Sequence, residues 1–224
     1  MAEGAVIVRA VEPTPYQREP GYALRYRDRR FTTGHGPGTD ARERRALRRL
    51  LAQAAAPDGA WLDVPCGAGR LVGELPAGSV QVDRDPAMLA AIERPGRRAC
   101  AYASALPFAD GSFAGVLCCR LLQHLPTPPE RIAVLGELKR VSRGAVIVSF
   151  FDAVSFVHLR RVLRRALGKT RSGRGAITRA RFRREAAAAG LEPVRFVALR
   201  RLLAEQTFVL LRPLRRTLPH QGPG

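Results

Sequence analysis

The chain has 224 residues, of which 46% are hydrophobic and 25% are charged, a composition that can bury one sizeable domain core. It holds no stretch near the roughly 18 uninterrupted apolar residues of a membrane span, and its first residues do not read as a secretory signal, so we expect a cytoplasmic protein. The 38 Lys and Arg against 19 Asp and Glu give a net charge of +19, which favours anionic partners such as nucleic acid or acidic lipid without choosing between them.

The first predicted element is a helix over residues 39–55. Its apolar residues recur at the spacing of one helical face: Leu47, Leu50, Leu51 and Ala54. Asp40 is expected to cap its first turn, with Glu43 completing a capping box.

Strand and helix patterns then alternate as far as residue 150. Strands are expected at 60–64, 79–83, 98–102, 113–119 and 144–150, with helices at 70–75, from 85 onward and at 129–142. Asp85 and Pro86 supply the cap and first position of the second of these helices. This alternation predicts βαβ units, and therefore a parallel sheet with right-handed crossovers.

Beyond residue 150 the pattern predicts a helix that begins at Thr178 and ends at Gly190, a strand after it, and a last strand over 205–212. These two strands are joined by a loop of about seven residues, and strands joined in this way can pair antiparallel at the edge of the sheet. The predicted fold class is thus α/β, doubly wound and Rossmann-like.

A glycine turn follows the first predicted strand in the segment WLDVPCGAG, residues 61–69. It places backbone N–H groups at a strand end, and Asp83, 20 residues after Asp63, can accept hydrogen bonds from two ribose hydroxyls. The pattern indicates a nucleoside site. A dinucleotide is disfavoured because Val72 stands where the third glycine of G-x-G-x-x-G is required, and no G-K-[ST] follows the turn, which excludes a P-loop.

The four cysteines offer no C-x-x-C spacing, and the chain has only four histidines. We expect Cys66, Cys100, Cys118 and Cys119 to be reduced and mostly buried, and we expect no metal site.

Three segments, in order and at the family's spacing, resemble four motifs of class I S-adenosylmethionine-dependent methyltransferases. WLDVPCGAGRL resembles the first motif, QVDRDPAML the second, and ASALPFADGSFAGVLCCRLLQHLP the third and fourth. The resemblance covers about residues 58–150 and is closest to the methyltransferase-11-like branch, which modifies small molecules, lipids and quinones. It implies a seven-stranded sheet, mostly parallel with an antiparallel terminal strand, and S-adenosyl-L-methionine as cofactor.

The resemblance also implies a set of cofactor-binding residues: Asp63, Pro65, Cys66, Gly67, Gly69, Asp83, Arg84, Met88, Ser104, Ala105, Leu106, Cys118 and Cys119. Asp63 would orient the glycine loop and the methionyl ammonium, and Asp83 would hold the ribose. Arg84 and Met88 would flank the adenine, and residues 105–106 would cover its edge. The backbone at 118–119 would meet the methionyl end.

Three departures from the family pattern involve four positions. Pro65 replaces a glycine, and Ala114 with Gly115 replaces the usual Asp-Val. Tyr102 stands where an aspartate usually accepts the adenine amino group, so Ser104, a backbone carbonyl or water would have to supply that bond.

His124 follows the fourth strand and is the best-placed candidate base for removing a proton from an acceptor, although a capping or packing histidine has the same appearance. Arg120 could hold an anionic acceptor or be a solvated arginine. The segment YALRYRDRRF resembles the part of the family that closes over the cofactor, so Tyr22 and Tyr26 are candidates for a lid or for ordinary helix packing.

We therefore expect a lid or extension at 1–38, a methyltransferase domain at 39–212 with a basic insertion at about 155–178, and a disordered tail at 213–224. From 156 to 184 the chain has 11 basic residues and no acid, which suits a cover over an acidic or lipid-linked acceptor, a membrane-surface contact, or a solvated helix.

Three functions remain open at this point. The first is a methyltransferase acting on a small-molecule or lipid-linked acceptor. The second is an RNA methyltransferase, favoured by charge but lacking a recognised RNA-binding module. The third is a non-catalytic basic binding protein on a methyltransferase fold.

Overall fold

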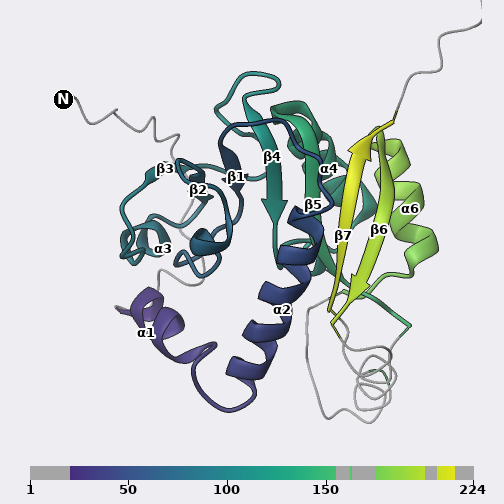
Figure 1. Cartoon of the computed structure of the whole chain (residues 1–224). Helices are drawn as coiled ribbons and strands as arrows, with labels where there is room; N and C mark the ends of the chain where they lie inside the picture. Colours follow the sequence, from purple (N-terminus) through teal and green to yellow (C-terminus); the bar gives the residue numbers. More distant parts are fainter. Residues whose placement is uncertain (1–20, 155–161, 163–174, 200–205, 215–224) are drawn as a thin grey trace, which may run out of the picture.

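The computed structural model describes residues 21–154, 162, 175–199 and 206–214 (Figure 1). These form one seven-stranded sheet in the order β3-β2-β1-β4-β5-β7-β6. The strands are β1 (Trp61–Asp63), β2 (Val80–Asp83), β3 (Arg97–Cys100), β4 (Phe113–Cys118), β5 (Ser142–Phe151), β6 (Leu191–Ala198) and β7 (Gln206–Pro213).

Strands β1 to β5 pair in parallel, and β7 runs antiparallel between β5 and β6. The chain moves outward from β1 to β3 on one side and from β4 to β5 on the other. Strand order therefore reverses between β1 and β4, where ligands of such sheets bind. The predicted fold class, including the antiparallel terminal strand, is confirmed.

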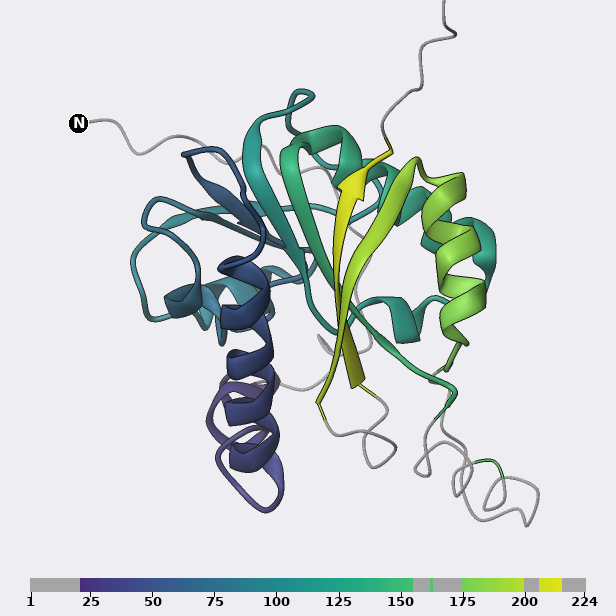
Figure 2. The same cartoon turned by 45° about the vertical axis from the view of Figure 1, so that its right-hand side comes forward.

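Helices cover both faces of the sheet (Figure 2). One face packs against α2 (Gly36–Leu51), and the opposite face packs against α4 (Pro128–Val141) and α6 (Arg179–Ala188). The residues of β5 from 145 to 151, a near-continuous apolar run, are all buried.

Side-chain caps begin three helices, two of them at the positions that the sequence indicates, Asp85 and Thr178. The side chain of Asp85 accepts a hydrogen bond from the Ala87 N–H and begins α3 (Pro86–Ala90). The side chain of Thr178 caps α6 in the same way. Helix α4 begins with a capping box between Thr127 and Glu130.

Two helix predictions are wrong in detail. Helix α2 begins at Gly36, before Asp40, so neither Asp40 nor Glu43 caps it; arginines bind both carboxylates instead. The helix expected at 70–75 is one short 3-10 turn, η2 (Val72–Glu74), which leaves the glycine turn to connect β1 to β2 with little regular structure.

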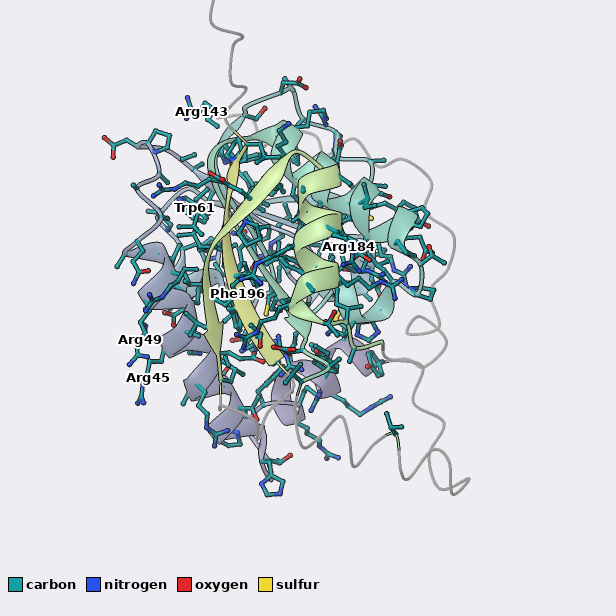
Figure 3. The ribbon with its side chains drawn as sticks, turned by 90° about the vertical axis from the view of Figure 1, so that its right-hand side faces the viewer. Arg45, Arg49, Trp61, Arg143, Arg184 and Phe196 are labelled. Carbon is teal, nitrogen blue, oxygen red and sulfur yellow. The ribbon has the colours of Figure 1, made fainter. Side chains whose placement is uncertain are left out.

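The departure at Gly115 has a packing reason. Trp61 in β1 is the parallel-sheet partner of Gly115 in β4, and a Cβ at Gly115 would lie 2.6 Å from the indole ring. The absence of a side chain at 115 therefore makes room for the buried Trp61, which is labelled in Figure 3. Larger residues at 115 would overpack this site.

Of the predicted basic insertion, only residue 162 and residues 175–178 are among the described residues, and most of the predicted tail also lies outside them. Within the described ranges, no helix is long and apolar enough to cross a membrane. The four cysteines are buried free thiols, as expected.

Candidate active site

A cavity of about 780 Å³ lies at the carboxyl ends of the central strands, within the roughly 300–1,000 Å³ typical of small-molecule sites. We call it the cofactor cavity. Its floor is the glycine turn after β1 together with the ends of β2 and β4, and its roof is helix α1 (Tyr22–Arg29) and Phe31. Helix α1 lies at the end of the sheet toward which β4 points (Figure 1).

The two glycines of the turn have different reasons to be glycine. Both have a positive φ, 55° at Gly67 and 77° at Gly69. A Cβ at Gly69 would lie 2.8 Å from Ile92, whereas a Cβ at Gly67 would meet no described atom within 4 Å. Gly69 therefore serves close packing, and Gly67 keeps open the space above the turn.

Asp83 ties the end of β2 to this turn. One carboxylate oxygen accepts a hydrogen bond from the Gly67 N–H at 2.8 Å, and the other accepts one from the Asp85 N–H at 2.9 Å. Burial raises the pKa of Asp83, and these two N–H groups oppose the rise. Each oxygen retains a second lone pair, so the carboxylate can still accept bonds from a diol in the cavity.

Asp63 has a different environment. It is 2% exposed and lines the cofactor cavity, and its carboxylate receives no hydrogen bond from any residue that the structure describes. Burial raises its pKa to about 7, with the Asp83 charge adding to the rise and the Arg70 charge opposing it. A buried carboxylate without a donor is energetically unfavourable, and a cationic ligand group would relieve it.

These features fit a nucleoside that carries an amino acid. The open space over Gly67 can take a ligand chain that lies against the backbone. The spare lone pairs of Asp83 can bind a ribose, and the donor-free carboxylate of Asp63 can bind an ammonium group. No feature for a metal accompanies them, because no group of three or more His, Cys, Asp or Glu side chains in the described part could hold one.

The remaining expected cofactor residues divide into two groups. Those that line the cavity are Pro65, Cys66, Arg84, Met88, Ser104 and Cys119, and Tyr102 lines it too. Ala105, Leu106 and Cys118 are not among its lining residues: Leu106 is buried in the core with its N–H bonded to Glu137, and Cys118 is fully buried. Residues 101–104 line the cavity at this strand end, and of these Ser104 was expected.

Helix α1 is held over the cavity by apolar contacts. Ala23 packs with Met88 and Ala91 of the α3 region, and the rings of Tyr22 and Tyr26 join this cluster. The two tyrosine rings lie 6.0 Å apart and both line the cavity. The tyrosines thus pack as part of an amino-terminal helix and also face the ligand space.

A charged cluster that our sequence analysis missed borders the cofactor cavity. Glu43 is fully buried and binds both Arg70 and Arg120, while Asp40 binds Arg70 and Arg44. Arg120 is therefore not the solvated arginine that one interpretation expected, since its side chain is only 19% exposed.

The position of Glu43 in the sequence carries a signal for this cluster. Glu43 precedes Leu47 by four residues and Leu50 by seven, so it lies on the apolar face of the helix. A carboxylate on that face needs a buried cationic partner, and both Arg70 and Arg120 directly follow strand-end segments.

His124 ends the short turn η3 (Leu122–His124) after β4, is exposed, and lines the cofactor cavity at its rim. Its neighbour Gln123, which sequence analysis missed, also lines the cavity, and its side-chain N–H₂ donates to the Arg120 carbonyl at 2.8 Å. Burial raises the pKa of Cys119 to about 12, so that thiol stays neutral at physiological pH.

Comparisons with known proteins agree with this geometry. Residues 62–150 match the model of a family described as a methyltransferase domain. The fold is similar to magnesium protoporphyrin IX methyltransferase from Synechocystis PCC 6803 with bound SAH, at 18% identity over 85% of this chain and 93% of that one, with a TM-score of 0.64. A search of curated proteins finds no match.

Two further solved structures are similar over most of both chains. An S-adenosylmethionine-dependent methyltransferase from Clostridium acetobutylicum has 13% identity over 86% of this chain and 97% of that one, with a TM-score of 0.65. The CcbJ methyltransferase from Streptomyces caelestis has 14% identity over 86% and 96%, with a TM-score of 0.63. At these identities the likeness establishes the fold.

The fold and the cavity define a nucleoside-binding α/β protein whose ligand lies at the strand-order switch. Residues 62–150 match a methyltransferase domain of the methyltransferase-11 type, and the fold is that of class I S-adenosylmethionine-dependent methyltransferases.

The two glycines give a paired prediction. Gly67→Ala is expected to abolish most S-adenosylhomocysteine binding at a stability loss of about 1 kcal/mol, because its methyl group enters the open space over the turn. Gly69→Ala is expected to lose about 1–3 kcal/mol of stability, because its methyl group collides with Ile92. Calorimetric titration measures the loss of binding in both variants, and urea unfolding measures the loss of stability. If the loss of binding stood in the same proportion to the loss of stability in both variants, the different roles assigned to the two glycines would be contradicted.

Proposed function

We propose that this enzyme methylates a small-molecule or lipid-linked acceptor that binds under helix α1. The observation that supports this is a second cavity, of about 730 Å³, lined by α1, Phe31, the start of α2, Arg120 and Phe151. We call it the acceptor cleft. It shares Tyr22, Tyr26, Arg30, Phe31 and Arg120 with the cofactor cavity, so the two spaces adjoin.

The position of the acceptor cleft suits a second reactant. Arg120 follows β4 and Phe151 ends β5, so the cleft lies over the strand ends on the β5 side of the cofactor cavity. Methyl transfer requires the nucleophile to approach in line with the methyl group and the leaving sulfur, and adjoining cavities can provide that alignment.

S-adenosylmethionine, when bound, supplies a methyl group already activated on a sulfonium sulfur. Asp83 would hold the ribose, and Asp63 would bind the ammonium group. Arg120, fixed by Glu43, would form a wall between the two cavities. His124 at the rim would take the proton that an acceptor hydroxyl or activated carbon loses as its electron pair bonds to the methyl carbon. We also propose a cytoplasmic location, which the four free thiols favour.

Calorimetric titration with S-adenosylmethionine and S-adenosylhomocysteine tests the cofactor site, and release of S-adenosylhomocysteine on addition of acceptor extracts tests turnover. We expect micromolar cofactor affinity in the wild type and a loss of about 100-fold or more in Asp83→Ala, because the ribose loses a charged acceptor in a buried site. Asp83→Asn preserves side-chain volume. Comparison with Asp83→Ala therefore separates the loss of the carboxylate from a disturbance of the glycine turn.

Asp58→Ala is the matched control, since Asp58 is an exposed aspartate on the loop before β1, away from the residues that line either cavity. It should bind both ligands like the wild type. Absence of binding at millimolar cofactor in the wild type would overturn the proposal, and turnover of RNA but not of small-molecule or lipid extracts would reassign the acceptor.

A further inference from the structure

We propose that the acceptor cleft selects an anionic aryl compound, one that carries a carboxylate or a phosphate on an aromatic ring. This rests on the proposed function, because it names the class of acceptor for the same site. Charge, aromatic lining and the relation of the cleft to the cofactor cavity each support it.

The charge of the cleft is one-sided. Its lining includes Arg25, Arg29, Arg30 and Arg120. Among the described residues that line it there is no aspartate or glutamate. Arg120 shares its partner Glu43 with Arg70, and Arg70 also binds Asp40, so these two guanidinium groups have carboxylate partners outside the lining of the cleft. For Arg29 and Arg30, no acidic partner occurs among the described residues.

The phenol of Tyr26 lies where this positive potential converges. Burial raises the pKa of Tyr26, and the charges of Arg120, Arg30 and Arg70 all act to lower it. Three cations thus act on one point of the wall between the two cavities. An anion placed beside that wall would be stabilised by the same field, more strongly where water is excluded.

The wall of the cleft is also aromatic. The ring of Tyr26 lies 6.0 Å from Tyr22 and meets the edge of Phe31 at 6.2 Å. Guanidinium groups surround Phe31, with Arg70 at 4.1 Å, Arg120 at 5.2 Å and Arg30 at 5.3 Å from the ring centroid. A planar ring can stack on or meet the edges of these side chains, whereas a bulky aliphatic ligand gains no such contact.

The two ends of the cleft differ in a way that sets the orientation of the acceptor. Arg25 and Arg29 are four residues apart on α1 and line the acceptor cleft without lining the cofactor cavity. Tyr26, Phe31 and Arg120 line both. An aryl anion would therefore place its charged group toward Arg25 and Arg29 and its nucleophilic atom toward the cofactor.

The test uses the full chain saturated with S-adenosylhomocysteine and titrated with benzoate, phenyl phosphate and the neutral benzamide. We expect saturable binding of benzoate or phenyl phosphate, at least about tenfold weaker binding of benzamide, and a loss of about tenfold in the double variant Arg25→Gln/Arg29→Gln. Preference for one anion over the other distinguishes a carboxylate acceptor from a phosphate acceptor.

The matched control is Arg45→Gln/Arg49→Gln, which removes the same charge at the same spacing from the exposed side of α2, where Figure 3 labels both residues at the outer edge of the molecule. It should bind the anions like the wild type. Equal binding of benzamide, no anion binding, or equal losses in the two double variants would overturn the inference.

The S-adenosylhomocysteine titration that precedes these steps separates the two proposals. If the wild type fails to bind S-adenosylhomocysteine, the proposed function fails. If it binds S-adenosylhomocysteine with the same affinity in both double variants but shows no preference for aryl anions, only the inference about the acceptor is wrong.

Discussion

Asp63→Asn is expected to weaken S-adenosylhomocysteine binding by about 10- to 100-fold while stabilising the cofactor-free protein at pH 8 by about 1–3 kcal/mol. Burial raises the pKa of Asp63 to about 7, well above that of an aspartate in an unfolded chain. Below about pH 7 the native state therefore holds the protonated form, and the ionisation that follows at higher pH is unfavourable to folding. Asparagine removes that ionisation together with the charge that binds the ammonium group.

The sign of the pH dependence follows from the raised pKa. The stability that Asp63 contributes is fully present below about pH 4 and is lost as pH rises through about 7, so the variant and the wild type should converge in acid. Cofactor affinity should change in the opposite direction, rising from pH 6 to pH 8 in the wild type as the carboxylate forms. Urea unfolding and calorimetric titration across this range measure both trends.

The Asp63→Asn variant is also the control for this profile, because its remaining affinity should lack the rise near pH 7. A wild-type affinity that is flat or falls from pH 6 to pH 8 would contradict an ionised Asp63 as the ammonium partner. A stability gain in acid equal to that at pH 8 would show that the effect comes from packing and not from charge.

Glu43→Ala is expected to lower the free energy of unfolding by about 3–5 kcal/mol, because it leaves Arg70 and Arg120 without their shared buried carboxylate. Glu185→Ala is the matched comparison. Glu185 forms a two-bond pair with Arg131 between α4 and α6, on the opposite face of the sheet, and both residues are almost fully buried. A similar loss of stability is expected there.

Added sulfate should distinguish the two variants. The side chains of Arg70 and Arg120 are 17% and 19% exposed and border the cavities, whereas that of Arg131 is 3% exposed. An anion can therefore replace Glu43 but not Glu185. Thermal unfolding with and without sulfate should show a larger recovery in Glu43→Ala than in Glu185→Ala or the wild type, and equal recovery would contradict an anion-accessible cluster.

Local signals in the sequence predicted much of the fold. Asp85, Thr178 and the apolar runs of β4 and β5 act within a few residues of where they stand, so their meaning does not depend on distant partners. The glycine turn and Asp83 were predicted for the same reason, since a strand end, two glycines and an acid at the next strand end lie on one short segment.

Local signals did not predict the ion-pair cluster around Glu43. Its partners Arg70 and Arg120 are 27 and 77 residues away, and the local pattern around Asp40 and Glu43 matches a capping box equally well. The absence of residues 105 and 106 from the cavity lining has a similar origin, because Glu137, 31 residues further on, binds the Leu106 N–H and helps to hold that segment in the core.

Helix α1 and Phe31 cover two cavities at once, and this shared roof links the occupants energetically. A ligand that immobilises Tyr22, Tyr26 and Phe31 from one side changes the surface that the other ligand meets. Linkage then requires that each ligand alter the affinity of the other by the same factor. The methyl acceptor would accordingly act as an effector of cofactor exchange, with no regulatory site beyond a single two-turn helix.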